Sequence, residues 1–136
     1  MTTGPTVITE PGIAALVSRF YGKARRDSTI GPLFEEAVDD WDEHLAKLCD
    51  FWSSVMLTSG RYKGNPMASH IKHAIEPEFF DRWLELWRET AGEIFCPETA
   101  AQFRQKAENI AASLRLALFY RLGRDRVPVS GGGASA

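Results

Sequence analysis

The chain carries three histidines, and imidazole is the side chain best suited to both metal binding and proton transfer near neutral pH. His44 falls on the apolar stripe of its predicted helix, together with Leu48 and Phe51, so it faces whatever that helix covers. His70 and His73 share one face of a short segment. Each histidine also has a purely structural interpretation. His44 could be half-buried and bonded to a backbone carbonyl, and of His70 and His73 one could be partly buried and the other solvated.

Two metal chemistries suit these imidazoles. The three histidines and a carboxylate would suit zinc, but the chain has no HExxH motif, and its nearby acids lack a strict ligand spacing. A single axial imidazole in an apolar, aromatic-walled pocket suits haem iron instead. Cys49 and Cys96 form no CxxCH motif, so a haem would be held non-covalently. Spacing alone leaves open whether His70 or His73 would bind the iron.

Two aromatic hydrogen-bond donors lie on stripes that are predicted to face inward. Tyr21 follows Phe20 in the first helix, and a buried phenol must find a hydrogen-bond partner. Trp83 raises the same question, because its indole N–H can only donate. Tyr21 and Trp83 therefore each either make a structural hydrogen bond or point a donor into a pocket. We interpret Trp87 as a residue of the core. We identify no Ser/His/Asp or Cys/His triad, phosphate loop or basic patch.

The composition is that of one globular domain. The chain has 136 residues, of which 44% are hydrophobic and 25% charged. Its net charge of −2 argues against nucleic-acid or membrane-surface partners. The first residues lack the pattern of a signal peptide, no apolar run reaches the length of a membrane span, and two widely separated cysteines favour a reducing cytoplasm.

The elements that must position these residues are helices, because apolar residues recur at three- and four-residue steps and no stretch alternates with period two. We therefore expect an all-α domain over residues 11–123, between a flexible lead-in, 1–10, and a flexible tail, 124–136. After the first helix, Gly31-Pro32 predicts only a short turn that carries Leu33 and Phe34. The predicted helical segments are 11–24, 39–58, a short histidine-bearing piece 66–73, 76–96 and 97–123.

Five motifs, in order and with comparable spacing, resemble the group III truncated haemoglobins from about Ile13 to Tyr120. Each is weak alone, but together they are specific. They are Phe20-Tyr21; Gly31-Pro32-Leu33-Phe34; Trp41-Asp42-Glu43-His44 followed by Phe51-Trp52; Gly64-Asn65-Pro66 with His70 four residues later; and Phe79-Phe80-Asp81-Arg82-Trp83-Leu84.

The resemblance implies a two-over-two helical sandwich that encloses haem b. It assigns His70 as the iron ligand and Tyr21, His44 and Trp83 to the distal ligand pocket. We further expect contacts with the cofactor from the following residues: Phe20, Phe34, Lys47, Leu48, Phe51, Trp52, Arg61, Tyr62, Lys63, Pro66, Met67, His73, Phe79 and Phe80. Among these, we expect Lys47 or the loop residues Arg61, Tyr62 and Lys63 to meet the haem propionates.

The function that the resemblance implies is reversible binding of dioxygen, carbon monoxide or nitric oxide, with nitric oxide dioxygenation or peroxide reduction as redox activities. The chain has no flavin or reductase segment, so a separate reductase would supply electrons to a monomer or weak dimer. Two alternatives come from other classes. One is a haem-free helical sensor or interaction module whose aromatic residues are only core, and the other is a zinc hydrolase.

Overall fold

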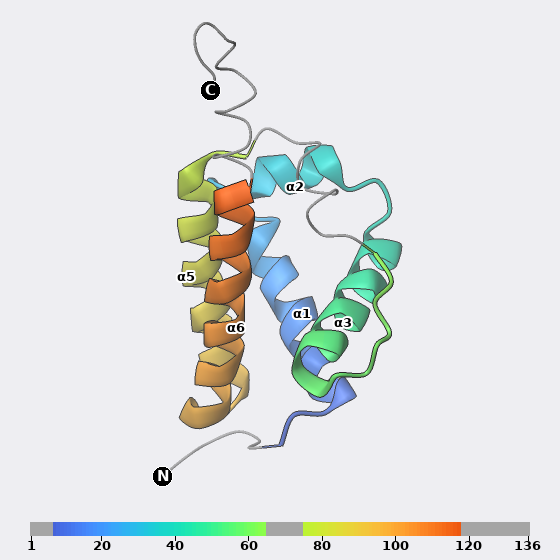
Figure 1. Cartoon of the computed structure of the whole chain (residues 1–136). Coiled ribbons are helices and arrows are strands. Elements are labelled where there is room, and N and C mark those ends of the chain that lie inside the picture. Colours follow the sequence, from blue (N-terminus) through green and yellow to red (C-terminus); the bar gives the residue numbers. More distant parts are fainter. Residues whose placement is uncertain (1–6, 65–74, 118–136) are drawn as a thin grey trace, which may run out of the picture.

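A computed structural model describes residues 7–64 and 75–117 of the chain, and within these ranges every regular element is a helix (Figure 1). The helices are α1 (Glu10–Ala24), α2 (Gly31–Ala37), α3 (Trp41–Leu57), α5 (Pro77–Ile94) and α6 (Pro97–Arg115). The prediction of an all-α fold is confirmed. Among the described helices, none is long and apolar enough to cross a membrane.

Two pairs of helices make up the fold. α5 and α6 run side by side as an antiparallel hairpin, and α1 lies against α5 on one side and against α3 on the other (Figure 1). α1 is the central element, because six of its residues are buried at helical spacing: Ile13, Leu16, Val17, Phe20, Tyr21 and Ala24. This arrangement sets the inward faces of α3 and α5 on either side of α1.

Local signals in the sequence explain where most helices begin. The Thr9 side chain accepts a hydrogen bond from the amide of Gly12, at 3.1 Å, and caps α1. The Asp40 carboxylate accepts from the amide of Glu43, at 3.2 Å, and caps α3. A proline stands in the first turn of α1, α5 and α6, where its missing N–H costs no helical hydrogen bond.

The stretch after α1 forms the helix α2, so the prediction that it is only a turn is wrong. Asp27 starts this helix: its Oδ2 accepts from the amides of Thr29 and Ile30, at 2.9 and 3.1 Å. Gly31 then fits where another residue would not, because an added Cβ would lie 2.6 Å from the carbonyl oxygen of Arg25. Gly31-Pro32 therefore begins a helix here, whereas α1 has already ended at Ala24.

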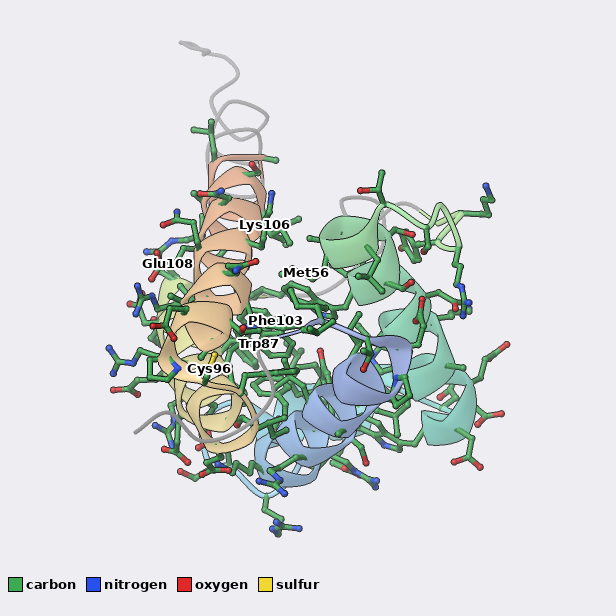
Figure 2. The ribbon with its side chains drawn as sticks, turned by 90° about the horizontal axis from the view of Figure 1, so that it is seen from below. Met56, Trp87, Cys96, Phe103, Lys106 and Glu108 are labelled. Atoms are coloured by element: carbon green, nitrogen blue, oxygen red, sulfur yellow. The ribbon has the colours of Figure 1, made fainter. Side chains whose placement is uncertain are left out.

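The centre of the core is aromatic. Trp87 is fully buried, and its indole N–H donates to the carbonyl oxygen of Phe103 at 3.2 Å, which confirms the interpretation of Trp87 as core. Figure 2 shows Trp87 and Phe103 together in the interior. Phe95 stacks on Phe103 with ring centroids 4.8 Å apart, and so fills the end of the core beside the α5–α6 turn.

Asp27 also links the end of α1 to α5 through Arg82, and this link makes the free energy of unfolding depend on pH. The Arg82 Nε donates to the Asp27 Oδ1 at 2.8 Å, and the Asp27 side chain is only 8% exposed. Burial raises the pKa of Asp27, but the bonds from Arg82 and from the amides of Ile30 and Thr29 outweigh it and hold the pKa below its ordinary value. The charged Asp27 therefore stabilises the fold above about pH 4, and this contribution is lost as pH falls through the lowered pKa.

We expect Asp27→Asn to lower the free energy of unfolding at neutral pH by about 1–3 kcal/mol, because charge-assisted hydrogen bonds are replaced by neutral ones. The difference from the parent chain should begin to shrink near pH 4, where Asp27 of the unfolded chain takes up a proton, and should be lost below the lowered pKa of Asp27 in the folded chain. Urea unfolding at several pH values measures both effects. Glu35→Gln, which removes an exposed carboxylate paired with Arg25 at 3.0 Å, is the matched control. An equal loss at every pH would contradict this account.

Candidate functional site

Tyr21 and Trp83, on α1 and α5, meet in the interior. The Trp83 indole N–H faces the Tyr21 hydroxyl closely enough to lower the pKa of the phenol, against the effect of burial. Tyr21 is 4% exposed, and Phe20, which is fully buried, lies edge-on to both rings. The two donors that the sequence singles out are therefore direct partners.

The Tyr21 phenol keeps its proton. Burial raises the pKa of Tyr21 far above its ordinary value, and the hydrogen bond from Trp83 opposes this shift only in part. Because the neighbouring Trp83 indole can only donate, it does not accept from the Tyr21 O–H, which is left to act as a donor. A protonated, oriented phenol in an apolar setting can stabilise a polar ligand that accepts a hydrogen bond.

His44 lies beside Tyr21. Its ring meets that of Tyr21 edge-on, with centroids 5.9 Å apart, and its Nε2 is buried. Phe34 of α2 approaches Tyr21 from another side, with centroids 5.4 Å apart. The structure thus brings together Tyr21, Trp83, His44 and Phe34 from four helices.

The sequence-based set of site residues leaves out Trp41. Its ring lies 5.5 Å from that of His44 and 6.0 Å from that of Tyr21, and the guanidinium of Arg25 sits 4.3 Å from its centroid. The available signal was the three-residue step from Trp41 to His44, which places both on one helical face. Trp41 completes the aromatic surroundings of Tyr21 on the α3 side.

Two residues expected to contact a cofactor lie deeper than the pocket. Trp52 is 1% exposed and stacks on Trp87, with centroids 4.4 Å apart and planes inclined by 21°. Phe20 is fully buried between Tyr21, Trp83 and Trp87. In this structure both rings support the residues that surround the site, and they offer almost no surface of their own.

The faces of α3 and α5 that flank the site are apolar but only half covered. Of the 17 residues of α3, only Trp52 and Ser53 are fully buried. Figure 2 shows Met56 extending from α3 toward α6. The half-buried apolar residues are Leu45, Leu48, Phe51, Val55 and Met56 on α3, and Phe79, Trp83 and Leu84 on α5.

The loop after α3 holds three of the four residues expected at the propionates. Lys47 on α3 and Lys63 in the loop are exposed. Tyr62 lies edge-on to Phe51 with centroids 5.2 Å apart. Arg61 turns toward the start of α1, where its Nε lies 3.7 Å from the Glu10 carboxylate. Arg61 is therefore already engaged with an acid of the protein itself.

Phe79 and Phe80 separate at the start of α5. Phe79 is half-buried and packs against the main core, on the side of Trp83. Phe80 packs instead against Ala111 and Leu114 of α6, in a smaller cluster of its own. Adjacent residues of one helix thus serve different surfaces.

The predicted iron ligand lies outside the described residues, as do three of the expected cofactor contacts: Pro66, Met67 and His73. Within residues 7–64 and 75–117, no group of three or more His, Cys, Asp or Glu side chains is arranged to hold a metal ion. The described part of the chain therefore supplies the walls of the site and its hydrogen-bond donors.

Comparison with known proteins places these features in a family. A group 3 truncated hemoglobin, ctb, of Campylobacter jejuni is 34% identical over 117 residues, which cover 82% of this chain and 92% of the relative. The crystal structure of a group III truncated hemoglobin from Campylobacter jejuni superposes with a TM-score of 0.80 at 34% identity, over 85% of this chain and 95% of that one. No family model matches the chain.

Proposed function

The chain belongs to the group III truncated haemoglobins, and from this premise we propose that it holds haem b and reversibly binds dioxygen, carbon monoxide and nitric oxide. The family implies globin-type ligand binding at a haem. The observation that carries the proposal is the Tyr21–Trp83 pair, an oriented hydrogen-bond donor beside an apolar site. We further propose that the protein acts in the cytoplasm as a monomer or weak dimer.

The described residues fit a haem. A flat, largely apolar group needs apolar walls, and the half-covered faces of α3 and α5 supply them through Leu48, Phe51 and Phe79. Lys47, which precedes Leu48 on α3, and Lys63, in the loop after α3, are exposed cations. Either could pair with the propionate carboxylates at the edge of a haem. In the proposal His70 holds the iron, and haem then supplies one open coordination position for a diatomic gas.

The residues of the chain decide how long a gas ligand stays. In the proposal the Tyr21 O–H donates to a ligand that accepts a hydrogen bond, and the Trp83 indole N–H on the phenol oxygen favours that orientation. A hydrogen bond to a charged or strongly polar acceptor contributes about 1.5–3 kcal/mol. The rings of Phe34, Trp41 and His44 surround Tyr21 and keep water from competing for its proton.

An absorption spectrum tests the proposal most directly. The purified protein, or the haem-free chain titrated with haemin, should show the Soret band of haem b, shifted on reduction and again on adding carbon monoxide. Extraction of the pigment as its pyridine complex identifies the haem type. A chain that stays colourless after titration with haemin would overturn the proposal and favour the haem-free interaction module.

Peroxide reduction is the second candidate function. It is favoured by the surroundings of Tyr21, because the phenol and the neighbouring indoles are the protein side chains that most readily give up one electron. Sustained turnover, like nitric oxide dioxygenation, needs electrons from outside the chain, and we propose a separate reductase or a small reductant as their source.

A further inference from the structure

Three indoles form a continuous stack from the candidate site into the core. Trp83 and Trp87 are nearly parallel, with planes inclined by 6° and centroids 5.4 Å apart. Trp87 and Trp52 are inclined by 21° with centroids 4.4 Å apart. Trp83 and Trp87 are one turn apart on α5, whereas Trp52 comes from α3, so the stack crosses between helices. Trp87 is the middle ring of the three, and Figure 2 shows it in the interior.

Each end of the stack reaches a phenol. At the Trp83 end, the indole N–H faces the phenol of Tyr21, the proposed ligand donor, and Phe20 lies edge-on to both rings with centroids 5.4 and 4.7 Å away. At the other end, Trp52 lies edge-on to Phe51 at 5.5 Å, and Phe51 lies edge-on to Tyr62 at 5.2 Å. Tyr62 is half-buried in the loop that follows α3, and so it reaches solvent.

The polar groups around the rings favour loss of an electron from the stack over loss from Trp41, which also contacts Tyr21. The carbonyl of Phe103 accepts from the indole N–H of Trp87, and this dipole stabilises positive charge on the ring. Trp41 also touches Tyr21, but the Arg25 guanidinium over its face opposes positive charge there. Removing an electron is therefore harder at Trp41 than at Trp87.

We propose that this aromatic relay, Tyr21–Trp83–Trp87–Trp52 with Tyr62 at its outer end, carries single electrons from the protein surface to the ligand site when a hydroperoxide is reduced there. The proposal rests on the proposed haem function. Reducing hydrogen peroxide to two waters consumes two electrons and two protons. Each electron leaves Tyr62, its phenol proton passes to solvent, and a one-electron reductant such as ascorbate then restores the phenol by giving it a hydrogen atom.

The test locates the radical. Haem-loaded protein is treated with hydrogen peroxide and a nitrone spin trap, and the adduct is mapped by mass spectrometry. In the parent chain we expect it on the peptide that contains Tyr62. In Trp87→Phe the adduct on Tyr62 should be lost, and adducts on Tyr21 and Trp83 should rise in its place. An adduct on Tyr62 that is unchanged in Trp87→Phe would overturn the relay.

Two variants keep this test decisive if Trp87→Phe folds poorly. Trp52→Phe interrupts the same stack from α3 and should give the same shift, and Tyr62→Phe removes the outer end. Phe95→Leu is the matched control, because it removes a buried ring that stacks on Phe103, outside the relay. Loss of the Tyr62 adduct in Phe95→Leu as well would mean that core disturbance, not the relay, controls the pattern.

A second measurement does not use haem. Azide radicals, made by pulse radiolysis, oxidise tryptophan in the haem-free chain, and the tyrosyl absorption that follows reports transfer between rings. This absorption should decrease in Tyr62→Phe and form more slowly in Trp87→Phe. If electrons pass between the rings in a chain that fails to bind haem, the proposed haem function is wrong but the electron path through the rings exists. If the chain binds haem and gases normally but no electron transfer is seen, the relay is wrong and the proposed function stands.

Discussion

Replacing His70 with alanine should leave a protein that binds little haem. An axial imidazole supplies the bond that anchors iron in this class of site, and without it only apolar contacts and edge charges hold the cofactor. We expect added imidazole to restore much of the Soret absorption of His70→Ala, because the free ligand replaces the missing side chain in the cavity it leaves. Haemin titration followed by absorbance, with and without imidazole, measures both effects.

The control is His73→Ala, which should load haem almost as well as the parent chain. The two histidines lie three residues apart, so spacing alone does not separate them, and the choice of His70 comes from the family resemblance. Normal loading of His70→Ala together with loss in His73→Ala would transfer the assignment to His73.

Replacing Tyr21 with phenylalanine should increase the dioxygen dissociation rate about 10- to 150-fold, which corresponds to the loss of a hydrogen bond of about 1.5–3 kcal/mol. Autoxidation should also accelerate. Carbon monoxide should respond much less, because it carries little charge and accepts hydrogen bonds poorly. Stopped-flow ligand replacement measures both dissociation rates in the same protein.

Trp83→Phe should change the dioxygen dissociation rate in the same direction, but through Tyr21, because its indole N–H faces the phenol oxygen. The double change should therefore be little worse than Tyr21→Phe alone. Phe95→Leu, which removes an aromatic ring of the core away from the pair, should leave the rate near that of the parent. Additive effects of Tyr21→Phe and Trp83→Phe would show that each residue acts on the ligand independently.

Helix boundaries were predictable where side chains close the first turn. Asp40, Pro77 and Pro97 place the starts of α3, α5 and α6 within a residue or two of their predicted positions. α2 was missed because Gly31-Pro32 was interpreted as a turn that follows a helix, whereas it forms the first turn of a new one. The deciding interaction, the Asp27 carboxylate on two backbone amides, depends on a side-chain orientation that the sequence does not state.

The site was predictable one helix at a time. Periodicity places Tyr21 and Trp83 on inward faces, but whether the indole faces the phenol depends on how α1 and α5 are rotated against each other. Periodicity also does not show which of two adjacent residues, Phe51 or Trp52, enters the core. The apolar stripe of α3 includes both, yet Trp52 turns into the core while Phe51 stays half-buried. Arg61 meets Glu10 across the fold, a contact between distant segments that no local pattern contains.

The half-covered face of α3 has a consequence for how much of this protein a cell keeps. A helix whose apolar side is incompletely buried opens more readily than the rest of the fold, and opened segments are where proteases cut. Anything that binds only the folded form shifts that balance by about 2.7 kcal/mol at a hundred times its dissociation constant. If haem is that ligand, we expect the lifetime of the polypeptide to follow the supply of haem, so that cells starved of iron should accumulate less of the protein at an unchanged rate of synthesis.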